Sequence, residues 1–180
     1  MSIFYLISLY LILIFTILLF IFQLFLNLPR SKTEKVYPYF TGKVLVMVPC
    51  KNIDFTLKEN LLSLKSQDYT NYDLIAIIDS KEDPAFTIIN ELGIKYIFTN
   101  YECDGCSGKV RALSTAMTKF TGYSVYVIAD SDILAQKDWL SKLVSPFVIP
   151  STGVTTTFPY FKPVGVKLKK YTPILQVKFL

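Results

Sequence analysis

The stretch VYVIADSD, residues 125–132, joins a run of apolar residues to two carboxylates. Its first five residues are rich in Val and Ile, which is typical of a strand covered on both faces of a parallel sheet. Asp130 and Asp132 follow this run directly. In open parallel sheets, ligands bind outside the carboxyl ends of the strands. The stretch therefore predicts a buried strand with a ligand site at its end.

Similar apolar runs recur along the chain and alternate with segments of helical spacing. Strands are expected at 43–48, 73–78, 94–98, 125–129 and, as a fifth, 154–157. Helices are expected after Asp54, which would cap the first, then over 84–92, from Ser107 to about Gly122, and through 139–144. The apolar residues expected on one face of the first and third helices are Leu57, Leu61, Leu64, Val110, Leu113 and Met117. This alternation predicts an α/β fold with a parallel sheet and right-handed crossovers.

Residues 3–28 are almost entirely apolar, and no charged side chain precedes Arg30. As a helix this segment would be roughly 39 Å long, more than the ~30 Å hydrocarbon core of a bilayer. It therefore predicts a transmembrane helix. The alternative is a cleaved signal peptide, which would normally show a basic start and a small-residue cleavage site. Basic residues follow the span closely, so the positive-inside rule predicts a single-pass protein of the cell membrane with its C-terminal domain in the cytoplasm.

The remaining part of the 180-residue chain is long enough for one domain with a core. We expect a juxtamembrane linker over 29–42, a domain over 43–160 and a tail of apolar and basic residues over 161–180. The chain has no His, which excludes Ser-His-Asp and Cys-His catalysis and His-ligated metal sites. A net charge of +5 without a basic block or zinc-finger spacing gives no indication of nucleic-acid binding.

Asp130 and Asp132 are candidate ligands for a metal ion. Mg²⁺ and Mn²⁺ prefer oxygen ligands and leave coordination positions open for phosphate oxygens. A metal bridging a diphosphate would stabilise charge on a departing nucleotide. The alternative is a loop or helix cap with solvated acids. The position of the two acids directly after a buried strand favours the metal site.

Two further segments have open alternatives. Asp79 ends the second expected strand and is either a turn residue or an acceptor for a nucleotide base or ribose. Ser107 begins a helix whose start could bind an anion with help from Lys109 or Arg111, although an ordinary capped helix would have the same sequence.

Cys103 and Cys106 form an isolated C-x-x-C pair. Zinc and redox sites normally need more than this pair, so reduced loop thiols are expected, as in the cytosol.

Three segments together resemble a known family. These are 46–85, CSGKVRALSTAM at 106–117, and 125–147, and they are similar to membrane-anchored family 2 glycosyltransferases, especially the ceramide glucosyltransferase-like family 21. The resemblance implies a GT-A fold and metal-dependent, inverting transfer of a sugar from a nucleotide-sugar, with a UDP-sugar expected, to a lipid or glycan. It places Pro49 and Cys50 against the nucleotide.

The resemblance also implies roles for four residues at the strand ends and the helix start. Asp79 corresponds to the acid that contacts the base, and Lys109 to the basic residue near the diphosphate. Asp130 and Asp132 correspond to the acids that bind the metal, Mn²⁺ or Mg²⁺, and the donor phosphates. Residues 43–160 would then be the donor-binding half of the domain.

Two features of the resembled family do not occur in this sequence. These are a later catalytic Asp and a Gln/Arg-x-x-Arg-Trp motif, since the last acid is Asp138 and the single Trp is Trp139. The catalytic base is therefore unknown. A second polypeptide or a homo-oligomer could supply the acceptor half. The alternatives are an inactive or split fragment that acts as a membrane-anchored nucleotide-sugar-binding partner, and a nucleotidyltransferase.

Overall fold

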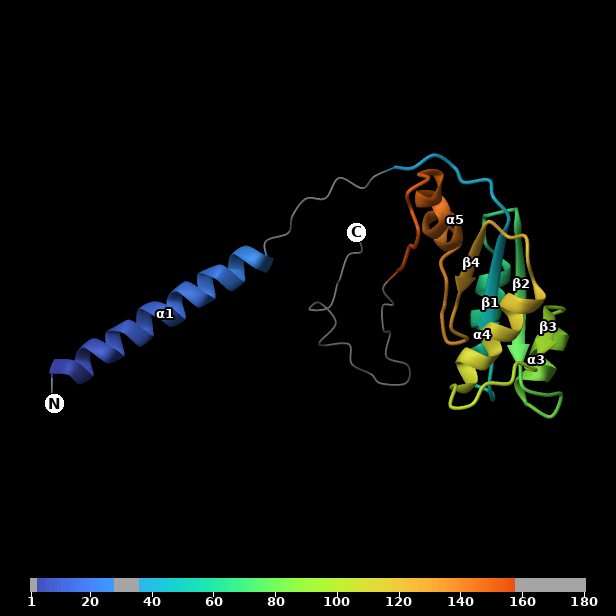
Figure 1. Cartoon of the computed structure of the whole chain (residues 1–180), viewed down its shortest axis with the longest axis horizontal. Helices are drawn as coiled ribbons and strands as arrows, with labels where there is room; N and C mark the ends of the chain where they lie inside the picture. The colour runs from blue at the N-terminus through green and yellow to red at the C-terminus, as the bar shows by residue number, and fades with distance from the viewer. Residues whose placement is uncertain (1–2, 28–35, 158–180) are drawn as a thin grey trace. The chain divides into compact units, whose positions relative to one another are not determined.

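The computed structural model describes residues 3–27 and 36–157, which form two separate parts (Figure 1). The first is helix α1, Ile3–Asn27, and its residues 3–24 are long and apolar enough to cross a membrane, with none of them buried. Within this helix the hydroxyls of Ser8 and Thr16 donate to the carbonyls of Tyr5 and Leu13. Internal satisfaction of this kind is what a lipid environment requires.

The second part is an α/β domain around a four-stranded parallel sheet, as the sequence predicts. Its elements in chain order are β1 (Val44–Pro49), α2 (Leu57–Lys65), β2 (Tyr72–Ile78), α3 (Ala85–Glu91), β3 (Lys95–Phe98), α4 (Gly108–Lys119), β4 (Val125–Ile128), α5 (Trp139–Val144) and the 3-10 helix η1 (Ser145–Val148). The strand order is β3-β2-β1-β4, and all three pairings are parallel.

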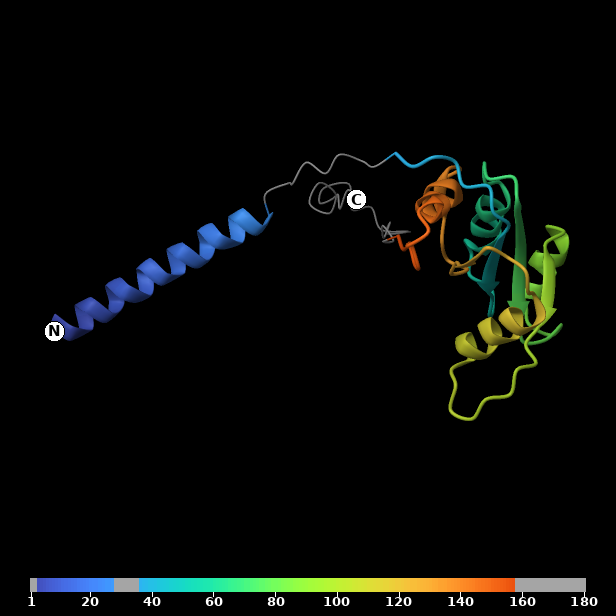
Figure 2. The same cartoon turned by 45° about the horizontal axis from the view of Figure 1, so that its top comes forward.

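Helices cover both faces of the sheet (Figure 2), and an apolar cluster lies on each face. Val44, Val46 and Val48 of β1 face a cluster that includes residues of α2, α3 and α5. Leu45 and Met47 point to the other face and pack with residues of β2 and α4. Because β1 is covered on both sides, its sequence is apolar throughout instead of alternating with polar residues.

Helix α4 buries only part of the predicted face, since Leu113 packs against the core but the other two predicted residues do not. Val110 and Met117 are 48% and 47% exposed, whereas Ala112, Thr115 and Ala116 are buried. Small side chains allow a helix to approach a sheet closely, so the alanines rather than the larger residues mark the contact face. The prediction was wrong for Val110 and Met117 because it relied on the hydrophobicity of the side chains and not on their fit to the sheet.

Two other local predictions were wrong. Residues 154–157 form no strand in the described part of the chain; instead the hydroxyl of Thr155 donates to the carbonyl of Leu143 at 2.9 Å, which holds this segment to α5. Asp54 does not occupy the cap position of α2, which belongs to Thr56. The Asp54 side chain accepts from the Thr56 N–H at 3.2 Å and so stabilises the turn before the helix.

Residues at the end of the expected linker contact the domain. The ring of Tyr39 stacks on that of Tyr69, and the Tyr69 hydroxyl donates to the carbonyl of Gly42. Phe40 packs against the core. The chain is therefore already in contact with the domain several residues before β1 begins. The domain boundaries themselves remain predictions.

An ionic cluster stabilises the amino-terminal edge of the sheet. The carboxylate of Asp73 accepts from Lys95 Nζ at 2.9 Å and from the Tyr123 hydroxyl at 2.8 Å, and lies 3.2 Å from Lys43 Nζ. The hydrogen bond from Lys95 and then that from Tyr123 lower the pKa of Asp73 from 3.8 to about 2. The side chain of Asp73 is 23% exposed, so solvent only partly screens these interactions.

We expect Asp73→Asn to lower the free energy of unfolding by about 1–2 kcal/mol at neutral pH. A lowered pKa in the folded state adds stability above the unfolded pKa, and this stability is lost as the pH falls from about 4 to about 2. Thermal denaturation of the full chain in detergent at pH 7, 4 and 2.5 measures the effect. Glu91→Gln, which breaks the exposed Lys58–Glu91 pair, is the control and should lower the free energy of unfolding only slightly. An equal deficit of Asp73→Asn at pH 7 and 2.5 would contradict the assignment.

Candidate active site

The strand order places a switch point between β1 and β4. From β1 the chain proceeds to β2 and β3 on one side, and β4 then pairs with the other edge of β1. Open α/β sheets bind ligands at the carboxyl side of such a point. Both strand ends there are fixed by backbone hydrogen bonds, from the Cys50 N–H to the Ile77 carbonyl at 2.8 Å and from the Ala129 N–H to the Met47 carbonyl at 3.0 Å.

Lys109 and Asp130, two residues predicted for donor binding, form an ion pair. Lys109 lies in the first turn of α4, whose N-cap is Ser107 as predicted, since the Ser107 hydroxyl accepts from the Val110 N–H. Asp130 follows β4. The start of α4 and the end of β4 therefore meet at the carboxyl edge of the sheet. The side chains of both partners are about half exposed, 51% and 53%, and a ligand could reach them.

Asp132 is two residues further along the same loop and is exposed. No group of three or more Asp, Glu or Cys side chains that could enclose a metal occurs within residues 3–27 and 36–157. Mg²⁺ and Mn²⁺ do not need such a cage, because they commonly use one or two carboxylates and take their other ligands from phosphates and water. The two exposed carboxylates of Asp130 and Asp132 fit this kind of site.

Asp79 lies at the end of β2 and is also exposed. Its carboxylate is 3.7 Å from Lys51 Nζ in the loop after β1. The structure therefore places Asp79 next to the end of β1. Among the contacts of the described residues, none joins Asp79 to Lys109 or Asp130. Asp79 and that pair are associated with two different strand ends of the same sheet edge.

The sequence analysis missed the role of Asp83. Its carboxylate accepts from the Asn52 N–H at 3.0 and 3.2 Å and from the Ala85 N–H at 2.9 Å. It therefore joins the loop after β1 to the start of α3. Asn52 has a positive φ of 62°, a conformation that Asn tolerates better than most residues. An Asp directly before a Pro at a helix start was the available signal.

Pro49 and Cys50 are at the end of β1, where the sequence predicts contact with the nucleotide. The Cys50 side chain is buried, and its thiol donates to the Val48 carbonyl at 3.5 Å. Burial and, secondly, the negative charge of Asp83 raise the pKa of Cys50 to about 12. The thiol is therefore neither a nucleophile nor a metal ligand at neutral pH. Any contact of this residue with a ligand would have to involve its backbone.

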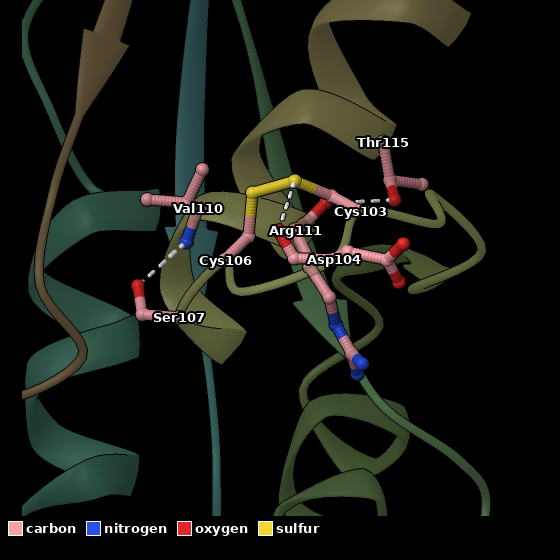
Figure 3. Close-up of a disulfide and its surroundings, with 7 residues drawn as sticks. All are labelled: Cys103, Asp104, Cys106, Ser107, Val110, Arg111 and Thr115. Atoms are coloured by element: carbon pink, nitrogen blue, oxygen red, sulfur yellow. Dashed lines mark hydrogen bonds between the residues drawn. A yellow bond between two sulfur atoms is a disulfide. The ribbon is translucent and has the colours of Figure 1, made fainter.

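The expectation that Cys103 and Cys106 are reduced thiols was wrong, because the structure joins them in a disulfide (Figure 3). Gly105 between them has φ +76°, which turns the chain and brings the two Cα atoms to 5.6 Å, a normal distance for a disulfide. The bond lies immediately before Ser107 and therefore at the start of α4. The sequence interpretation had rested on the expected compartment and could not take this turn into account.

Polar side chains in α2 and just after it hold the loop that follows β4. The sequence analysis missed this feature too. The principal side chain is Asn60, which is only 3% exposed and donates to the Ser131 carbonyl between the two acids. A signal was present, since Asn60, Ser63 and Gln67 recur at helical spacing beside the apolar face of α2.

The three cysteines should differ in reactivity. In protein purified without reductant, we expect no alkylation of the native chain, because Cys50 is buried and the other two are joined. Denaturation alone should expose Cys50, and denaturation with reductant should expose all three. Mass spectrometry after iodoacetamide treatment measures this, with Cys50→Ser as the control. Labelling of Cys103 or Cys106 in denatured, unreduced protein would contradict the disulfide.

The chain matches Glycosyl transferase family 21 over residues 9–167. Among solved structures, it is similar to a mannosyltransferase from Pyrobaculum calidifontis in complex with GDP-Man and Mn²⁺, with 24% identity and a TM-score of 0.55. The match covers 68% of this chain and 38% of that one, so the chain spans well under half the length of that enzyme. A weaker similarity is to TarS 1–349 from S. aureus, with 24% identity and a TM-score of 0.40. This match covers 53% of this chain and 29% of that one. The parallel sheet is thus of the GT-A type, and the chain belongs to glycosyltransferase family 21.

Proposed function

We propose that this chain is the donor-binding part of a membrane-bound glycosyltransferase that transfers a sugar from a nucleotide-sugar with the help of Mn²⁺ or Mg²⁺. The observation that carries the proposal is the contact between Lys109 and Asp130 at the switch point of the sheet. It brings a cation for the diphosphate and a carboxylate for the metal to one exposed place. The mannosyltransferase of similar fold, solved with GDP-Man and Mn²⁺, supports this assignment.

The proposed binding reaction exchanges ion-pair partners. In the structure Lys109 neutralises Asp130. A bound diphosphate would take over Lys109 and the positive end of the α4 dipole, which leaves the Asp130 carboxylate free to bind the cation together with Asp132. When bound, the metal ion stabilises negative charge on the departing nucleoside diphosphate. Inverting transfer also requires a general base for the acceptor hydroxyl, to which we assign no residue.

Asp79 is the proposed contact for the nucleotide base. It is exposed at the end of β2, beside the loop that Asp83 holds after β1. A carboxylate can accept from the single ring N–H of uracil or, with both oxygens, from the N–H and amino group of guanine. The sequence resemblance favours a UDP-sugar, and the structurally similar mannosyltransferase contains GDP-Man. A comparison of UDP with GDP is therefore the first experiment on the donor.

The metal site is tested by thermal shift of the full chain with UDP or GDP, each with and without Mn²⁺. We expect nucleotide and metal together to stabilise the wild type and Asp132→Asn to lose most of this stabilisation, because it removes a ligand charge at nearly constant shape. Asp79→Asn should weaken nucleotide binding even without metal. Glu91→Gln, on the distant surface of α3, is the matched control. Equal metal-dependent shifts in wild type and Asp132→Asn would refute the site.

We also propose that α1 is a membrane anchor that leaves the catalytic domain on the cytoplasmic face of the cell membrane. The charge distribution supports this, since basic residues follow the apolar segment and none precede it. The disulfide argues for the opposite side, because such bonds are rare in the cytosol.

A tag at Leu180 separates the two orientations. In sealed vesicles with the cytoplasmic side inside, we expect the tag to be protected from protease until detergent is added. Digestion of the tag in intact vesicles would overturn the proposed orientation. An N-terminus near residue 30 in the mature chain would instead identify α1 as a cleaved signal sequence.

A further inference from the structure

Helix α2 and the residues just after it carry a row of polar side chains beside the apolar face. The row consists of Asn60, Ser63 and Gln67, and Asn60 is buried although it is polar. A buried amide is costly unless it is hydrogen-bonded. The partners of this row therefore indicate what it does in the structure.

Apart from Thr56 at the cap of α2, the partners outside this helix belong to the segment 131–140, which consists of the loop after β4 and the first residues of α5. The Asn60 amide nitrogen donates to the Ser131 carbonyl at 3.1 Å and also to the Thr56 hydroxyl at 3.1 Å. The Ser63 hydroxyl accepts from the Ala135 N–H at 2.9 Å. The bonds to Ser131 and Ala135 reach backbone groups more than 70 residues away in the sequence, so they join two parts of the fold that are distant along the chain.

Gln67 continues the row past the end of α2. Its amide nitrogen donates to the Gln136 carbonyl at 3.0 Å, and its amide oxygen accepts from the Leu140 N–H at 2.9 Å. The neighbouring Asp68 N–H donates to the Lys137 carbonyl at 2.9 Å. The loop is thus held at intervals along its length, from the residue after Asp130 to the start of α5.

The hydrogen bond from Asn60 to Ser131 affects the two acids because of where Ser131 lies. Ser131 lies between Asp130 and Asp132, and the peptide unit that follows it is planar. A hydrogen bond that fixes the Ser131 carbonyl therefore also fixes the orientation of the peptide leading into Asp132. A turn bond of 3.3 Å from the Ile133 N–H to the Asp130 carbonyl also holds this segment, and Lys109 pairs with the Asp130 carboxylate. Asn60 is the side chain that donates to the backbone between the two acids.

We propose that Asn60, with Ser63 and Gln67, forms a set of positioning residues for the divalent-cation site on the loop after β4. The inference rests on the proposed function, in which Asp130 and Asp132 bind the metal. Metal sites depend on groups that hold the ligands in place, and loss of such groups typically lowers metal affinity about 10–100-fold. The α2 row acts through the loop backbone and touches neither carboxylate.

The test measures Mn²⁺ binding to the full chain in detergent, from the electron paramagnetic resonance signal of free Mn²⁺, with and without GDP or UDP. Asn60→Ala should raise the Mn²⁺ Kd about tenfold or more. Gln67→Glu retains an acceptor for Leu140 but loses the donor to Gln136, and should have a smaller effect. Asn71→Ala is the matched control, since it removes an amide-to-carbonyl bond of 2.9 Å to Thr41, before β1, and should leave Mn²⁺ binding unchanged.

Amide hydrogen exchange gives a second readout that does not depend on metal. In Asn60→Ala, exchange at Ile133 and Ala135 should become faster while the amides of β1 remain protected, which shows that the loop is released and the sheet is intact. Unchanged Mn²⁺ affinity in folded Asn60→Ala would overturn the positioning role and leave the donor site standing. If Asn60→Ala does not fold, the same two measurements on Gln67→Glu decide.

The wild type separates this inference from the proposed function. Mn²⁺ affinity that is absent, or that Asp132→Asn leaves unchanged, would overturn the proposed metal site and the positioning role with it. A Kd that rises in Asp132→Asn and Asn60→Ala, but not in Asn71→Ala, supports both.

Discussion

Strand β1 is hydrogen-bonded on both edges and buried on both faces, and the candidate site depends on this position. Its registers with β2 and β4 fix where those two strands end relative to Pro49. Residues 44–48 are at most 1% exposed, so β1 cannot shift without disturbing both halves of the core. Because the chain leaves β1 to one side and later pairs with its other edge, the ends of β1 and β4 lie next to each other at the carboxyl edge, where open α/β sheets bind ligands.

The sequence predicted the parts of the fold that follow from hydrophobic runs. The four strands are short, apolar and bounded by charged or turn-forming residues, and tertiary contacts only refine their ends. It failed where the choice depended on a partner that the sequence does not identify. Met117 has the spacing of a buried helical residue but is exposed, since alanines lie against the sheet. Val154 follows a strand-like pattern, yet its segment is held to α5 by the Thr155 hydroxyl.

The candidate site shows the same division. Asp130, Lys109 and Asp79 could be proposed from their positions at strand ends and a helix start together with the family resemblance, although each position also suits an ordinary turn or cap. For Asn60 and Asp83 the sequence held a signal for the residue, but it could not identify what each one binds. Their partners are backbone groups 71 and 31 residues away, and no side-chain chemistry in the sequence identifies a backbone carbonyl or N–H as a partner. The residues that hold a site in place therefore become visible only in the fold.

Exposed and buried polar groups have different roles at this site, for a physical reason. A half-exposed ion pair such as Lys109–Asp130 contributes about 0–1 kcal/mol, because water screens it and both side chains lose freedom. Giving up this pair for a diphosphate and a cation therefore costs little, which suits groups that must change partners. If the loop moved away, the buried amide of Asn60 would keep its bond to Thr56 but lose its bond to Ser131, and an unmatched buried donor costs about 1–3 kcal/mol. The structure thus combines carboxylates that can exchange partners with a loop backbone that resists displacement, and such a combination favours a pre-formed site.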